Sequence, residues 1–127
     1  MSRSHWLSLG AAAVLLLCAS SALAQNRDNC FRMSQLQSTR ADGDQRIYAR
    51  VNVHDFYRID LQFRCSSLPY ADRGIVLKPA GGKDLICTPL DLDLKANNAG
   101  ALEPCFIKSI TRLTPEEAAA IPAKVRP

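Results

Sequence analysis

The sequence has no apolar run long enough to cross a membrane as a helix. Its apolar segment from Leu7 to Leu17 has eleven residues, whereas a spanning helix needs about twenty. A short basic start precedes this segment, and the small-x-small tripeptide Ala22-Leu23-Ala24 follows it. Residues 1–24 are therefore predicted to be a signal peptide that is cleaved before Gln25. The mature chain is expected to be periplasmic or secreted, with no transmembrane span after cleavage.

Two alternatives to simple cleavage stay open. Cys18 follows the sequence VLLL and could carry a lipid anchor. Lipidation motifs of this kind place a small residue directly before the cysteine, and Leu17 stands there instead. The segment could also be retained as an anchor.

The sequence also lacks a dominant sign of charge. The mature chain, Gln25 to Pro127, has 103 residues, which predicts one domain with a modest core. Without Arg3 it has fifteen basic and twelve acidic residues, interspersed along the chain. This small excess is compatible with an anionic partner but does not argue for one. A monomer is expected, and an exported chain is not expected to bind nucleic acid.

Histidine and closely spaced cysteines are scarce. The mature chain has one histidine, His54, and no Cys-x-x-Cys unit, so neither a thioredoxin-like redox site nor a paired zinc knuckle is indicated. No metal and no cofactor is expected. An even number of cysteines in a small exported domain predicts two disulfides instead. The cysteines are Cys30, Cys65, Cys87 and Cys105.

Signatures of several enzyme classes are absent as well. There is no G-x-S-x-G motif, and Gly81-Gly82 lacks the residues that complete a P-loop. Two weaker catalytic candidates are His54 beside Asp55, and the pair Asp91 and Asp93. Either could supply acid and base groups. The simpler interpretation is a turn for the first and strand alternation for the second.

The clearest positive feature is alternation of apolar and polar residues. It runs from Arg46 to Val53 and again from Tyr57 to Phe63, which predicts an antiparallel hairpin. A three-residue loop, His54 to Phe56, would place Val51 opposite Ile59 and keep one face apolar. A bulge is an equally good alternative, because no glycine lies there to adopt a positive φ.

Turn signals elsewhere divide the chain into short strands. They are expected at Phe31 to Thr39, Ile75 to Lys78, Lys83 to Cys87, Leu90 to Leu94 and Cys105 to Leu113. The second and third of these are expected to form a hairpin across PAGG. Thr114-Pro115-Glu116-Glu117 is typical of a helix start with a capping box. This helix is expected to end near Ile121.

The predicted fold is mainly β: a small antiparallel sheet or half-barrel with one short C-terminal helix. The disulfide-stapled domain is expected to cover residues 30–121. Residues 25–29 would form a short N-terminal extension, and residues 122–127 a frayed tail.

The cysteine pairing can be narrowed from the strands. In a three-stranded meander, Cys30 and Cys65 lie at opposite ends of the sheet, roughly 25 Å apart at ~3.3 Å per residue, whereas a disulfide needs Cα atoms within about 7 Å. That pair is therefore not expected. We favour Cys30–Cys105 with Cys65–Cys87 over Cys30–Cys87 with Cys65–Cys105.

Three segments together carry a resemblance. They are CFRMSQLQSTRADGDQRIYARVNVHDFYRIDLQFRC, ICTPLDLDL and CFIKSITRLTPEE. This pattern resembles a family of small exported bacterial proteins classed as a domain of unknown function, over about Cys30 to Glu117. The resemblance implies an exported domain stapled by cysteines, and it brings no activity, ligand or catalytic residue.

The polar face of the hairpin is the favoured binding surface. Its guanidinium groups and aromatic ring could contact phosphate or carboxylate groups; the residues are Arg46, Tyr48, Arg50 and Arg58. In the expected register Arg50 faces Asp60, so the simpler interpretation is a wet sheet face finished by an exposed ion pair.

The leading hypothesis is an exported, non-enzymatic β-rich module that binds a protein or an envelope component, such as lipopolysaccharide or anionic lipid. One alternative is a small periplasmic hydrolase that uses His54 with Asp55, or Asp91 with Asp93. Another is a protease or lysozyme inhibitor, for which the loop KPAGGKD, residues 78–84, is the natural contact segment.

Overall fold

A computed structural model describes residues 29–71 and 74–127. The predicted signal peptide, with Cys18, lies outside the described residues. In the described part the chain is mainly β with one short α-helix, as expected. The strands are β1 Phe31–Arg32, β2 Leu36–Ala41, β3 Arg46–Val51, β4 Asp55–Leu61, β5 Ile75–Pro79, β6 Leu85–Ile86, β7 Leu92–Asn98, β8 Ala101–Pro104 and β9 Ile107–Arg112.

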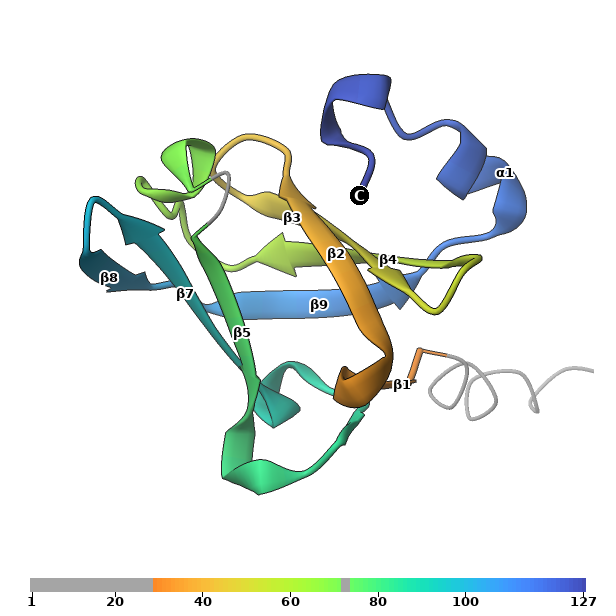
Figure 1. Cartoon of the computed structure of the whole chain (residues 1–127), viewed down its shortest axis with the longest axis horizontal. Helices are drawn as coiled ribbons and strands as arrows, with labels where there is room; N and C mark the ends of the chain where they lie inside the picture. The colour runs from red at the N-terminus through yellow and green to blue at the C-terminus, as the bar shows by residue number, and fades with distance from the viewer. Residues whose placement is uncertain (1–28, 72–73) are drawn as a thin grey trace, which may run out of the picture.

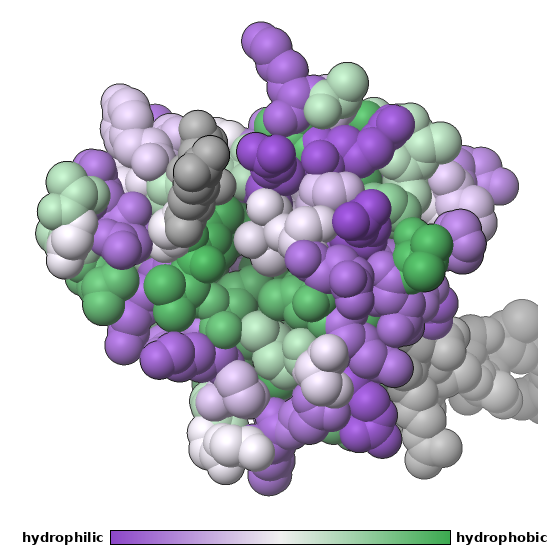
Figure 2. Space-filling model, viewed as in Figure 1, coloured by the Kyte–Doolittle hydropathy of each residue, from purple (hydrophilic) through white to green (hydrophobic). Residues whose placement is uncertain are grey.

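These strands form three antiparallel sheets: a four-stranded sheet in the order β2-β3-β4-β9, a three-stranded sheet β5-β7-β8 and the pair β1-β6. In Figure 1, β2 and β5 cross in front of β4 and β9. Because β2 and β5 do not pair with each other, the barrel is not closed. Figure 2 shows apolar side chains on this front face between the two strands. Leu36 of β2 and Ile75 and Leu77 of β5 are partly buried and pack against the core.

Most apolar residues of the alternating segments face the core. Ile47, Ala49 and Val51 of β3 are almost fully buried, as are Tyr57 and Ile59 of β4. This burial is the main stabilising contribution expected for such a hairpin. The assignment of faces is therefore confirmed within β3 and β4, whereas Val53 and Phe63 at the ends of the alternating segments are exposed.

The register of the hairpin differs from the expected one. Val51 pairs with Asp55, and Ile47 lies opposite Ile59, so the loop spans Asn52 to His54 and not His54 to Phe56. Asn52 has a φ of 53°, a left-handed conformation that asparagine tolerates better than most residues. The turn therefore begins at Asn52 without a glycine. The even shift leaves each residue on its expected face.

The hairpin expected across PAGG does not form. Strand β5 pairs with β7, and β6 pairs with β1. A 3-10 turn, η3 Ala80–Gly82, connects β5 to the segment that leads to β6. Asp84 fixes that segment, because its carboxylate accepts hydrogen bonds from Ser34 N at 2.7 Å and Ser34 Oγ at 3.0 Å.

The disulfides are Cys30–Cys87 and Cys65–Cys105, with Cα separations of 4.1 and 5.6 Å. The pairing that we favoured was wrong, although the exclusion of Cys30–Cys65 holds. Pairing of β1 with β6 brings Cys30 beside Cys87. Because β9 runs antiparallel to β4 with Leu61 opposite Ile107, the residues after β4 meet the residues before β9. Cys65 therefore lies next to Cys105.

The C-terminal segment begins with the expected helix, α1 Pro115–Ala119. Thr114 Oγ1 accepts from Glu117 N at 3.2 Å, and Glu117 Oε2 accepts from Thr114 N at 2.9 Å, which confirms the capping box. Residues 122–127 are not frayed as expected. They contain a 3-10 turn, η5 Ala123–Val125, and the Arg126 guanidinium donates at 2.8 Å to the carbonyls of Ala119 and Ile121.

Candidate functional site

The outer face of the four-stranded sheet carries the favoured binding residues. Arg46, Tyr48 and Arg50 alternate with the buried residues of β3, and their partners on β4 are Asp60, Arg58 and Phe56 in that order. Arg58 therefore lies beside Tyr48. The structure thus brings the four residues to one face, with Asp60 among them.

Asp60 occupies two of these arginines at once. Its Oδ1 accepts from Arg46 Nε at 3.0 Å and its Oδ2 from Arg58 Nε at 2.8 Å. Burial raises the pKa of Asp60, but these charge-assisted hydrogen bonds outweigh the burial, and the pKa lies below its usual value. The expected pair of Arg50 with Asp60 is wrong, because the register places Arg46 opposite Asp60.

Tyr48 is covered and not presented to solvent. Its exposed fraction is 8%, and it lines a small hollow together with Arg58, Leu113 and Ile121. Ile121 follows α1 and is itself buried. The C-terminal segment therefore occupies the position from which a ligand would reach the tyrosine ring. In the described part of the chain, Arg46 and Arg58 each pair with a carboxylate, and Tyr48 is covered by the C-terminal segment. Arg50 is the one hairpin residue of the four with neither feature among the described residues.

The catalytic candidates are not gathered into one place. His54 and Asp55 line a hollow of about 870 Å³ with Arg112, whose guanidinium pairs with the Asp55 carboxylate. Asp91 and Asp93 do not line that hollow. The two candidate pairs of the hydrolase hypothesis thus do not share one hollow.

Asp91 and Asp93 do not share one strand. Asp91 ends the 3-10 turn η4 Pro89–Asp91, where its carboxylate accepts from the backbone N–H groups of Cys87 and Thr88 at 3.0 and 2.8 Å. These bonds lower its pKa. Asp93 lies in β7 and pairs with Lys95 at 3.4 Å. Both carboxylates therefore have local structural partners.

The loop of the inhibitor hypothesis, residues 78–84, protrudes at the bottom of Figure 1. Gly81 and Gly82 at its tip have φ values of 70° and 75°. Its two ends are fixed, since Pro79 pairs with Leu92 and Asp84 is bound by Ser34.

An exposed apolar patch, which we call the Phe106 patch, was not predicted. It consists of Phe63, Phe106 and Leu90. The two rings meet edge to face with centroids 6.3 Å apart, and Phe106 and Leu90 line one hollow of about 650 Å³. Alternation placed Phe63 and Leu90 within strands, but β4 ends at Leu61 and β7 begins at Leu92. Both side chains consequently lie outside the sheets, where the core no longer covers them.

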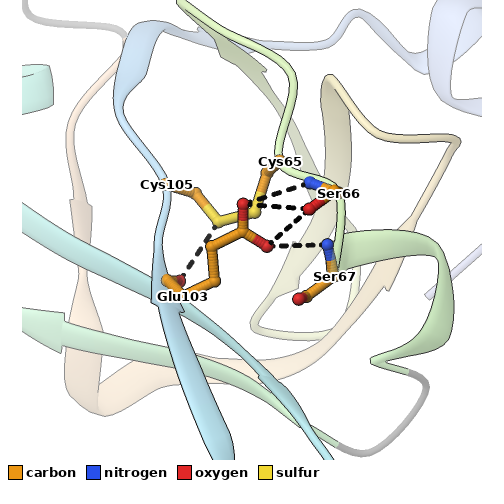
Figure 3. The surroundings of a disulfide bond; sticks show 5 residues. All are labelled: Cys65, Ser66, Ser67, Glu103 and Cys105. Atoms are coloured by element: carbon orange, nitrogen blue, oxygen red, sulfur yellow. Dashed lines mark hydrogen bonds between the residues drawn. A yellow bond between two sulfur atoms is a disulfide. The ribbon is translucent and has the colours of Figure 1, made fainter.

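A disulfide holds the patch in place. Cys65 and Cys105 lie two residues after Phe63 and one before Phe106, so their bond joins the two aromatic segments. Beside it, the Glu103 carboxylate accepts from the backbone N–H of Ser66 at 3.3 Å and of Ser67 at 2.7 Å (Figure 3). Hydrogen bonds lower the pKa of Glu103. The Ser67 side chain contributes most, followed by the backbone N–H of Ser67 and then by the N–H and hydroxyl of Ser66. The patch is therefore built on a cross-linked support.

One comparison with known proteins decides the family. The model of a family of unknown function, DUF6491, matches residues 1–126. The chain belongs to this family. Neither the curated proteins nor the solved structures contain a match. Membership of DUF6491 agrees with the resemblance seen in the sequence and assigns no activity.

Two further observations concern the described residues alone. In residues 29–71 and 74–127, no three His, Cys, Asp or Glu side chains are grouped so as to hold a metal ion. No helix in the same ranges has the length and apolar character that a membrane span requires.

Proposed function

We propose that the chain is an exported, non-enzymatic module that binds another protein through the Phe106 patch. Two disulfides in a small β-rich domain support export to an oxidising compartment. The predicted signal peptide supports the periplasm or the extracellular space as that compartment. Asp55, Asp91 and Asp93 each have a local structural partner, and the Asp91 pair does not line the hollow of His54 and Asp55, which favours binding over catalysis.

The observation that carries this proposal is the exposure of the patch. Leu90 is 88% exposed, and Phe63 and Phe106 are each 61% exposed. Apolar side chains that stay in water contribute little to the stability of the fold. Their burial against a partner is favourable. Large apolar and aromatic residues held rigidly beside a hollow are typical of the centre of a protein interface.

The rim of the hollow favours a protein over an anionic lipid. Lys78 and Asp93 both line it and lie opposite each other on β5 and β7. Their charges are opposite in sign, so the rim offers no excess of positive charge to an anionic headgroup. Pro79, Pro89 and Leu92 complete apolar walls that suit the side chains of a protein segment.

The test is whether complex formation depends on the patch. A tagged chain with Leu90→Ser and Phe106→Ser is compared with wild type and with a control in which Val53→Ser and Tyr70→Ser remove equally exposed apolar side chains elsewhere. Native gels of envelope extracts should show a complex with wild type and control that the patch variant lacks. A complex retained by the patch variant, or lost equally in both variants, overturns the proposal. Circular dichroism verifies that all chains are folded.

A further inference from the structure

We propose that Arg50 and Ser38 form a binding site for a phosphate or sulfate group on the outer face of the four-stranded sheet, with Arg40 at its edge. This site is separate from the Phe106 patch and does not depend on the proposed function. It rests on an unusual distribution of hydrogen-bond partners among the arginines.

Most arginines in residues 29–71 and 74–127 have an acceptor. Five pair with aspartates: Arg32, Arg46, Arg58, Arg64 and Arg112. Arg126 donates to two carbonyls. Arg40 and Arg50 have no ion pair within these ranges, and both project from the outer face of the sheet. Positive charge is therefore uncompensated at this one part of the face.

Arg50 differs from its neighbours in one specific way. Arg46, Arg58 and Arg64 each direct Nε at an aspartate oxygen, at 3.0, 2.8 and 2.7 Å. The Nε of Arg50 is buried and has no hydrogen-bond partner in the described part of the chain. A buried donor without an acceptor is unfavourable. An oxyanion would therefore do for Arg50 what Asp60 does for Arg46 and Arg58.

A second orphan group lies beside it. Ser38 Oγ is also buried without a hydrogen-bond partner among the described residues, and Ser38 is the Cα partner of Arg50 across β2 and β3. Directly opposite side chains in an antiparallel pair have Cβ atoms about 5 Å apart on the same face. The hydroxyl and the Nε–H are thus placed to donate to one group.

The β2 bulge produces this arrangement. The register shifts between Leu36 and Ser38, so Leu36 packs against the core while Ser38 turns to the outer face. Arg40, two residues on, is exposed and lies opposite Tyr48. Its position is diagonal to Arg50, within reach of a long side chain.

The donor set indicates the ligand class. An arginine binds an oxyanion through two parallel N–H groups, and Nε with one terminal nitrogen forms such a fork. The terminal nitrogens of Arg50 are not among the buried unpartnered atoms, so they reach the surface. Because Arg50 Nε is buried, binding through the fork requires a rotamer change of this side chain. Donors from two strands suit the tetrahedral oxygens of phosphate or sulfate.

The test uses inorganic phosphate and the oxidised, folded chain. In ¹⁵N NMR spectra, the Arg50 Nε–H resonance should shift and saturate as phosphate is added. Arg50→Gln should weaken phosphate binding about tenfold or more, since charge-assisted bonds are lost. Arg50→Lys keeps the charge but lacks the fork, and should resemble Arg50→Gln. Arg64→Gln removes the same charge from a side chain that is 79% exposed and should change affinity less than about twofold.

Two additions keep the result decisive. Ser38→Ala tests the site if Arg50 variants do not fold, and it should also weaken binding. Vesicles of phosphatidylcholine with and without phosphatidylglycerol identify the source of the phosphate. If the mixed vesicles bind and the variants rank in affinity as they do for inorganic phosphate, the source is a lipid headgroup. If only the inorganic ion binds, the source is a free phosphate. Absence of a saturable Arg50 shift, or equal losses in Arg50→Gln and Arg64→Gln, overturns the inference.

Discussion

Arg46 and Asp60 lie directly opposite each other on β3 and β4, and Arg46 Nε donates to Asp60 Oδ1 at 3.0 Å. Asp60 raises the pKa of Arg46 further above its usual value. Because Asp60 also accepts from Arg58, one carboxylate pairs with two cations on this face. The surface that the sequence presents as basic is thus partly balanced by its own acid.

Loss of the Asp60 charge should be costly. Asp60→Asn leaves Arg58 without a carboxylate and Arg46 with only the longer pair to Asp42 at 3.9 Å, and the free energy of unfolding should fall by about 1–3 kcal/mol. Asp93→Asn is the control, since its pair with Lys95 is roughly half exposed and should contribute less than about 1 kcal/mol. Urea denaturation measures both. Equal effects would show that Asp60 behaves as an ordinary surface charge.

The two disulfides should each stabilise the fold substantially. They enclose chain segments separated by 57 and 40 residues, for which the chain-entropy model gives about 4.2 and about 3.9 kcal/mol. Each pair replaced by serine should lower the urea midpoint strongly, and the effects should not add because the two loops overlap. Peptide mapping without reduction should give the observed pairing. A Cys30–Cys105 peptide would refute it.

Acid should weaken the clasp at Glu103. Hydrogen bonds hold its pKa below the ordinary value, so the folded state binds the proton less readily than the unfolded state. The contribution to stability is present above the unfolded pKa of about 4.5 and is lost as the pH falls through the lower folded pKa. Melting temperature against pH should therefore decline below about pH 4.5, and less steeply in Glu103→Gln. Parallel curves for the two chains would refute this role.

The turn between β7 and β8 should accept a stabilising change. Asn98 pairs with Ala101, and the two residues between them, Ala99 and Gly100, have φ values of 52° and 89°. Alanine is strained there, whereas asparagine and glycine are favoured in two-residue hairpin loops with positive φ. Ala99→Asn should raise the free energy of unfolding by about 0.5–1 kcal/mol. A decrease in the melting temperature would contradict the assigned turn.

Local patterns predicted the parts of the fold that depend on neighbouring residues. Alternation found the buried faces of β3 and β4, and the Thr114 capping box found α1. The register depended on Asn52 adopting a positive φ, which period-two alternation does not specify. Both the expected and the observed register keep the same faces, so hydrophobic pattern alone could not distinguish them.

Long-range pairing was harder to predict. The disulfide connectivity follows from the pairing of β6 with β1 and of β9 with β4. We expected strands that are adjacent in the sequence to pair, and this expectation led to the wrong connectivity. The Phe106 patch was missed because Phe63 and Leu90 fit the alternating pattern but lie just beyond the ends of the strands. The Ser38 site depends on a bulge, and the sequence contains no local signal for it.

Contact between the Phe106 patch and a partner protein can be measured in the cell envelope. The most direct measurement is site-specific photocrosslinking, with a photoreactive amino acid in place of Phe106 or, as control, Val53, which is 71% exposed. We expect a discrete protein adduct from position 106 and none from position 53. No adduct from position 106, or the same adducts from both positions, would contradict it.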